Sequence, residues 1–137
     1  MILKACPVVP HPDGHPVRLL SFLHPLAGAQ LVKGTVEPGE NPLHAMRREL
    51  IEETGLRARA IIDLGHSDDI QPSERWHFAL LRVRGPVQEQ WLHRTHDGGG
   101  LDFDCRWTAL DGPHPFEGRF ARAWGLMRSR LAEGDLA

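Results

Sequence analysis

Residues 34–56, GTVEPGENPLHAMRRELIEETGL, join a segment that cannot be helical to a helix with clear ends. Glycine and proline punctuate residues 34–40, which excludes the interior of a helix. Asn41 can cap a helix, and Pro42 suits the first helical position, where its missing N–H costs nothing. Gly55 suits the left-handed residue just past a helix end. The stretch therefore predicts a loop followed by a helix over 42–54.

Three acidic residues share one face of this predicted helix. Glu49, Glu52 and Glu53 have the spacing that places side chains together on a helix surface. Like charges at this spacing destabilise an isolated helix by roughly a few tenths of a kcal/mol per pair, so they favour a compensating cation. Mg²⁺ binds a few carboxylates and completes its shell with water and phosphate oxygens. Judged alone, a glutamate-rich helix is more often a solvated face paired with arginines.

The rest of the helix suggests how this acidic face is held. Leu43, Met46 and Leu50 fall on an adjoining face, which we expect to pack on a sheet. Arg48 is expected to pair with Glu40 or with another acid and to fix the geometry without binding metal.

The fixed positions of the stretch form a recognisable pattern. They are Gly34, five residues, Glu40, seven residues and then RELIEETGL over 48–56. This pattern resembles the complete Nudix box, with no substitution at any fixed position. At a usage of about 7% for each invariant residue, a chance match at one starting position is on the order of 10⁻⁸.

The resemblance implies a fold and a metal site. It implies an α/β fold, the Nudix α/β/α sandwich with a mixed sheet and a loop–helix–loop, in a single domain over 1–137. In similar proteins Glu52 and Glu53 are the principal metal ligands, Glu49 is a ligand or base, and the carbonyl of Gly34 often ligates. The implied cofactor is Mg²⁺ or Mn²⁺.

The resemblance also implies a reaction, the hydrolysis of a diphosphate linkage. The substrate would be a nucleotide sugar, ADP-ribose, a dinucleoside polyphosphate or a nucleoside triphosphate. Arg48 belongs to the catalytic set, together with the three acids, and orders the loop with Glu40. Glu49 is the preferred general base, and the acids later in the chain remain alternatives: Glu89, Asp97, Asp102 and Asp104. Two other functions stay open: a silent Nudix-fold module that binds a nucleotide or protein, and a scaffold with a structural cation.

The substrate contacts are less well defined by the sequence. The run from Lys33 to Glu40 is similar to the diadenosine polyphosphate and diphosphoinositol branches, but the chain lacks the tyrosine of the diadenosine branch. Pro72 is placed as in the ADP-ribose branch. The candidate contacts are Lys33, Arg75, Trp76 and His77, although a tryptophan in a strand more often fills the core.

Composition limits the partners. The chain is 41% hydrophobic and 25% charged, with a formal net charge of −2, which disfavours long nucleic acids. No apolar stretch is long enough for a bilayer span and no export signal is evident, so we expect a cytoplasmic protein. Cys6 and Cys105 are predicted to be free thiols, and the histidines to lie at the surface. The family resemblance suggests a homodimer.

Outside the box, periodicity predicts the remaining elements. Residues 2–9 and 16–24 are expected to form a hairpin around the turn at 11–14. A short apolar run at 29–32 leads into the loop. The other predictions are strands over 57–66, 74–84 and 101–109, a long loop over 85–100 and a helix over 116–132.

Overall fold

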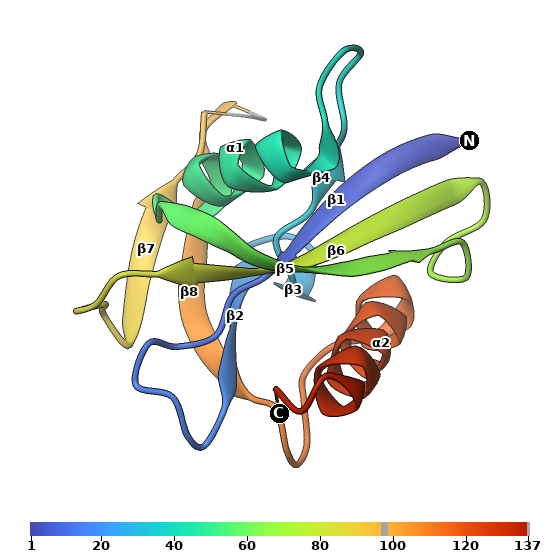
Figure 1. The fold of residues 1–137 in the computed structure, drawn as a ribbon. Helices are drawn as coiled ribbons and strands as arrows, with labels where there is room; N and C mark the ends of the chain where they lie inside the picture. Colours follow the sequence, from blue (N-terminus) through green and yellow to red (C-terminus); the bar gives the residue numbers. More distant parts are fainter. Residues whose placement is uncertain (97–98, 137) are drawn as a thin grey trace.

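The computed structural model describes residues 1–96 and 99–136, which form eight strands and two helices (Figure 1). The elements are β1 (Ile2–Val8), β2 (Arg18–His24), β3 (Gly28–Gln30), β4 (Gly34–Thr35), α1 (Pro42–Thr54), β5 (Ala58–Ser67), β6 (Glu74–Val83), β7 (Gln90–Arg94), β8 (Asp102–Ala109) and α2 (Gly118–Glu133). Neither helix is long and apolar enough to cross a membrane within these described residues.

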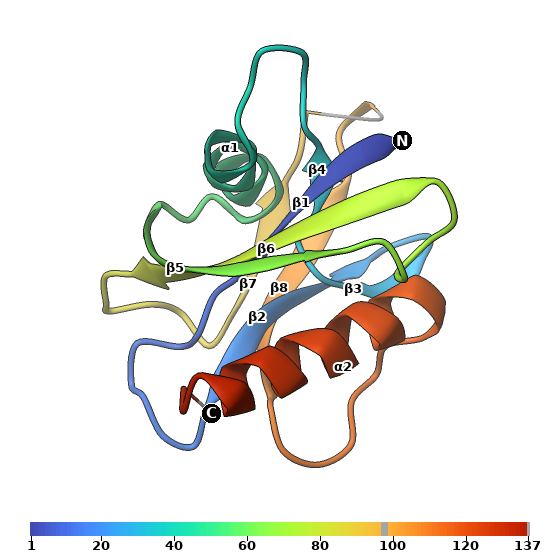
Figure 2. The ribbon, with the colours of Figure 1, turned by 45° about the vertical axis from the view of Figure 1, so that its right-hand side comes forward.

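The strands form two four-stranded sheets. The first sheet has the order β4-β1-β6-β5 and is mixed, because β1 and β6 run parallel whereas the other pairs are antiparallel. The second sheet has the order β3-β2-β8-β7 and is antiparallel throughout. Figures 1 and 2 show α1 and α2 on opposite faces of the first sheet. The predicted α/β/α arrangement with a mixed sheet is confirmed.

The side chains of β6 explain why a helix covers each face of the first sheet. Successive residues of a strand point to opposite faces. Trp76 and Phe78 are buried in one hydrophobic cluster with residues of α2, whereas Ala79 and Leu81 are buried in another with residues of α1. The strand is therefore apolar on both faces, and α1 is fixed on the face that faces away from α2.

The predicted hairpin of residues 2–9 and 16–24 is wrong. These strands lie in different sheets and share only the isolated bridge between Pro10 and Leu19, flanked by two backbone hydrogen bonds. The reason is that β4 and β6 occupy both edges of β1, so β2 has no edge to pair with. The turn at 11–14 exists, but it leads the chain from one sheet into the other.

The predicted loop over 85–100 is wrong at β7. Its residues pair with β8 along the edge of the second sheet. Trp91 packs inward, whereas Leu92 is 69% exposed, so the apolar pattern of this edge strand is weak. The other predicted strands agree with β5, β6 and β8 within one residue, and the second helix begins at Gly118, two residues later than predicted.

The burial predictions hold with a few exceptions. Met46 and Leu50 are buried under α1 as expected, but Leu43 is 38% exposed because it lies in the first turn, beyond the core. Both cysteines are free and buried. His11 was expected at the surface but is 5% exposed, with its ring edge-on to Trp107 at 4.8 Å.

Candidate active site

Helix α1 begins and ends where its capping residues predict. The Asn41 side chain accepts a hydrogen bond from the His44 N–H at 2.8 Å, and Pro42 follows at the first helical position. Gly55 adopts a left-handed conformation with φ of 80°, and its N–H donates to the Ile51 carbonyl. One face of the helix is buried, and the acidic face lies beside the loop that precedes the helix.

Glu40 and Arg48 tie this loop to α1. The Arg48 guanidinium donates to both carboxylate oxygens of Glu40 at 2.8 Å and to the Thr35 carbonyl at 3.1 Å. Glu40 also accepts from the Glu37 N–H and contacts His44. These hydrogen bonds, that from Arg48 above all, hold the pKa of Glu40 well below its usual range. The expected pairing of Arg48 with Glu40 is present.

Arg48 also faces the acids of its own helix. Its Nη1 lies 2.8 Å from Glu49 Oε1 and 3.5 Å from Glu52 Oε2. The Glu49 side chain is 13% exposed, whereas that of Glu52 is 44% exposed. One guanidinium thus compensates part of the negative charge on this face.

Glu53 lies deeper than the other two acids. Its carboxyl lies close to the backbone N–H of Lys33 and to the Glu49 side chain, both of which influence its pKa. Burial, followed by the neighbouring charge of Glu49, raises the pKa of Glu53 well above its usual value. Burial also raises the pKa of Glu49, although Arg48 opposes the shift. Two neighbouring carboxyl groups therefore lie where water is scarce.

Gly34 makes room for this pair. It pairs with Ala5 across β4 and β1, and a Cβ added to it would lie 2.0 Å from Cδ of Glu49. A side chain at position 34 would displace the Glu49 carboxyl, so glycine lets the strand pass this close while Glu49 keeps its position. The pattern's first residue is thus explained by contact with Glu49.

The donors suit a hard divalent cation, which favours carboxylate oxygens. A nearby positive charge would stabilise the ionised form of two neighbouring desolvated carboxyl groups. Within residues 1–96 and 99–136, however, no three acidic, histidine or cysteine side chains converge as in a ready-made metal site. Glu49 and Glu53 are neighbours, whereas the Glu52 carboxylate lies 3.5 Å from Arg48.

The candidate substrate contacts lie in different places. Lys33 adjoins Glu53, and burial together with the charges of Arg119 and Lys4 lowers its pKa. His77 faces a depression beside the start of α1, and Arg75 is bound to Asp68 at 2.7 Å. Trp76 is completely buried, and its Nε1 donates to Glu74, so this ring has no face for a substrate and that prediction is corrected.

The alternative general bases have other partners. Glu89 accepts hydrogen bonds from Arg18 and contacts His11. Asp102 pairs with Arg94. Asp104 pairs with Arg106 and accepts from Gln90. Asp97 lies outside the described residues.

Sequence reasoning missed Lys4 and Arg119, the two cations that act on Lys33. The Lys4 Nζ donates to the Thr35 hydroxyl at 2.7 Å, which places it beside the loop. Arg119 lies in the first turn of α2. No local pattern relates these residues to Lys33, because the tertiary fold alone brings their charges within range of it.

Comparison with known proteins identifies the family. The model of the NUDIX domain matches residues 9–123. The chain belongs to the Nudix family. The match confirms the family expected from residues 34–56 and, with it, the assignment to a family of hydrolases. No curated protein sequence is significantly similar to this chain.

Solved Nudix structures share the fold. An ADP-ribose pyrophosphatase from Streptococcus suis is 17% identical, with a TM-score of 0.70 over 96% of this chain and 91% of that one. An ADP compounds hydrolase is 20% identical, with a TM-score of 0.67 over 99% and 76%. A UDP-X diphosphatase is 13% identical, with a TM-score of 0.65 over 98% and 64%. At these identities the likeness establishes the architecture alone.

Proposed function

We propose that this Nudix protein is a metal-dependent hydrolase that cuts the diphosphate linkage of a nucleoside diphosphate derivative. The observation that carries the proposal is the proximity of Glu49 and Glu53, two desolvated carboxyl groups beside Gly34 and Lys33. Holding two like charges together in a desolvated place costs stability, and a site that binds a cation offsets this cost.

Each residue of the site has a role in this proposal. Glu53, Glu52 and Glu49, with the carbonyl of Gly34, would hold Mg²⁺ or Mn²⁺. The bound metal would neutralise phosphate oxygens and make water more acidic. Glu49 accepts the proton of the attacking water, because it lies at the boundary between the buried Glu53 and the exposed Glu52. Lys33 offsets charge on the substrate's phosphates.

Arg48 and Glu40 position these groups and do not react themselves. Their paired hydrogen bonds fix the loop against α1, and the same guanidinium holds Glu49. Effective catalysis requires reacting groups to be held closely in place. We therefore assign Arg48 and Glu40 to the ordering of the loop and the general base.

The names of the solved neighbours support an adenosine or uridine diphosphate derivative as substrate. Two of those proteins are named for ADP-ribose and ADP compounds, and the third for UDP compounds. Nucleoside triphosphates and dinucleoside polyphosphates remain in the proposed class. A homodimer and a cytoplasmic location stay predictions, which sedimentation and cell fractionation would test.

Turnover of a substrate panel tests the proposal. ADP-ribose, UDP-glucose, diadenosine tetraphosphate and dGTP are each incubated with Mg²⁺ or Mn²⁺, and products are separated by chromatography. We expect cleavage between phosphorus atoms, for example AMP and ribose 5-phosphate from ADP-ribose. Turnover is expected to stop when EDTA is added and to fall sharply in the Glu53→Gln variant. It should not change in Glu133→Gln, which alters an exposed acid of α2. If compounds of the panel bind but none is cleaved, the protein is instead a Nudix-fold module that binds a nucleotide without turnover.

A further inference from the structure

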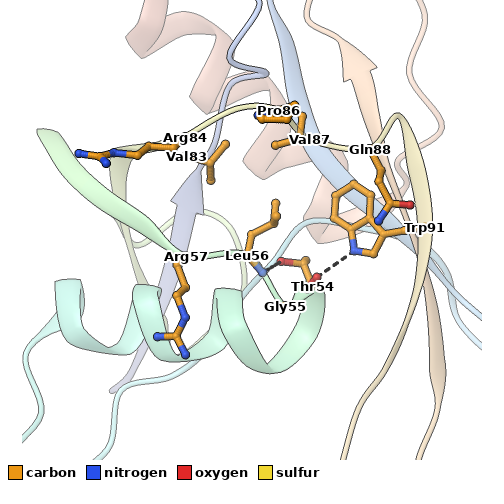
Figure 3. A pocket seen from close by; sticks show the side chains of 10 residues that line it. All are labelled: Thr54, Gly55, Leu56, Arg57, Val83, Arg84, Pro86, Val87, Gln88 and Trp91. Carbon is orange, nitrogen blue, oxygen red and sulfur yellow. Dashed lines mark hydrogen bonds between the residues drawn. The ribbon is translucent and has the colours of Figure 1, made fainter.

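A pocket of about 590 Å³ lies at the C-terminal end of α1 (Figure 3). Its apolar wall includes Leu56, Val83, Val87 and Trp91, while Arg57 and Arg84 lie on the side away from Trp91. The volume falls in the range of roughly 300–1,000 Å³ that is typical of small-molecule sites. The Trp91 Nε1 donates to the Thr54 carbonyl at 2.9 Å, which fixes the indole ring against the helix end.

A smaller depression of about 200 Å³ adjoins this pocket and shares Arg57 and Arg84 with it. Apart from Ala58 it is lined only by arginines: Arg57, Arg59, Arg82 and Arg84. We call these four residues the arginine cluster. All four are exposed.

The positive charges of the arginine cluster are not paired with carboxylates in the described part of the chain. Among the described residues, no member forms an ion pair or a side-chain hydrogen bond, whereas Arg18, Arg48 and Arg75 are all paired with carboxylates. Arg59 lies directly opposite Arg82 in the antiparallel pairing of β5 and β6. Like charges at directly opposite positions destabilise a sheet. An anion bound between them would remove this repulsion.

The charge is local to this place. The whole chain has a net charge of −2, so the cluster does not reflect a generally basic surface. A long nucleic acid needs many phosphate contacts over an extended basic surface, which this chain does not offer. A small ligand needs only the cluster and the pocket beside it.

We propose that the pocket and the arginine cluster form a second binding site, for a small molecule that joins a planar apolar group to phosphate, as a nucleotide does. Guanidinium groups bind phosphate oxygens through paired hydrogen bonds, and an indole ring packs against a planar base. Gly34, Glu49, Glu52 and Glu53 line neither cavity, so this site does not depend on the acids or on their metal.

Calorimetric titration with ADP in the presence of EDTA tests the second site. The Arg59→Gln/Arg82→Gln double variant is expected to weaken ADP binding by tenfold or more. Arg47→Gln is the matched control, because Arg47 is an exposed arginine of α1 outside both cavities. It should change the affinity by less than twofold. Adenosine, which lacks phosphate, should bind at least tenfold more weakly than ADP.

Titration of the Glu53→Gln variant with ADP distinguishes binding at this site from binding at the acidic site. We expect it to leave metal-free ADP binding within twofold of the wild type. The proposal is overturned if the double variant binds ADP as the wild type does, if adenosine binds equally well, or if Glu53→Gln changes the affinity substantially. The proposal is also overturned if no ADP binding is detected at concentrations up to about 10 mM, roughly tenfold above a millimolar Kd.

Discussion

Glu49 and Glu53 bring two carboxyl groups close together, and Arg48 pairs with only one of them. The Arg48 guanidinium donates to Glu49 and not to Glu53, whose pKa is the more strongly raised. Glu53 is therefore the acid whose ionisation most needs a further positive charge. Because of this asymmetry, substitution of Glu53 is the most informative test of the site.

Replacing Glu53 with Gln is expected to lower turnover by roughly 10²-fold or more, the scale on which a positioned catalytic group contributes. The metal-free melting temperature should stay the same or rise, because one of two crowded carboxyls becomes neutral. Steady-state kinetics and thermal melts in EDTA measure both effects, with Glu133→Gln as control. A large fall in the metal-free melting temperature would contradict this account of the pair.

Replacing Gly34 with Ala is expected to displace Glu49, since the new Cβ would lie 2.0 Å from its Cδ. The carboxyl must move by more than about 1 Å to reach ordinary contact distance, and such a misplacement can cost roughly 10²-fold in rate. Kinetics and circular dichroism would show lost activity in a folded protein. Gly125→Ala serves as control, because its Cβ meets open space. Unchanged activity in Gly34→Ala would show that the exact position of Glu49 is unimportant.

At the scale of elements, the loop and α1 behave as one unit that is capped at its start and cross-linked to the segment before it. Asn41 caps the helix, and Glu40 binds Arg48, which lies more than one turn further along the helix. Both contacts are formed within fifteen residues of sequence, which is why the sequence predicts this unit well. Two predictions test its parts separately.

Replacing Asn41 with Ala should destabilise the protein by about 1 kcal/mol, the usual cost of a lost helix cap. The His44 N–H would lose its side-chain acceptor at the helix start. Urea unfolding measures the change, and Asn41→Ser should recover most of the loss because serine also caps helices. Equal stability of the Ala and Ser variants would argue against a role for the cap.

The Glu40 contacts predict a pH dependence. The folded-state pKa of Glu40 is depressed, so its contribution to stability is present above its unfolded pKa and is lost as pH falls through the folded value. Glu40→Gln should therefore lower the melting temperature near pH 7, and the difference from wild type should shrink as pH falls below about 4.5. Melts from pH 7 to pH 3 measure it. A difference that stays constant over this range would contradict the electrostatic explanation.

At the scale of the whole molecule, α2 is fastened to the first sheet by arginines as well as by apolar packing. The Arg130 guanidinium donates to the Leu64 and His66 carbonyls at 2.7 and 2.8 Å. Arg122 donates to the Ile70 carbonyl at 2.7 Å. These contacts bridge more than fifty residues of sequence and hold β5, together with the turn after it, against the helix.

Replacing Arg130 with Ala should destabilise the fold by about 1–3 kcal/mol, because two charge-assisted hydrogen bonds are lost and two carbonyls lose their donor. Arg128→Ala is the control. Its ion pair joins side chains that are 52% and 93% exposed, so its loss should cost no more than about 0.5 kcal/mol. Chemical denaturation compares the two. Similar effects of both variants would mean that Arg130 does not fasten the helix.

The sequence by itself determined the loop, the ends of α1, the acidic face and the family, because these depend on contacts between near neighbours in the chain. The tertiary structure decided that residues 2–9 and 16–24 belong to different sheets, that β7 is a strand, and that Trp76 is buried. It also placed the charges of Lys4 and Arg119 where they act on Lys33, and it gathered the arginine cluster. The physical reason is that strand pairing and burial depend on which edges and faces distant segments leave free, and no local pattern encodes this.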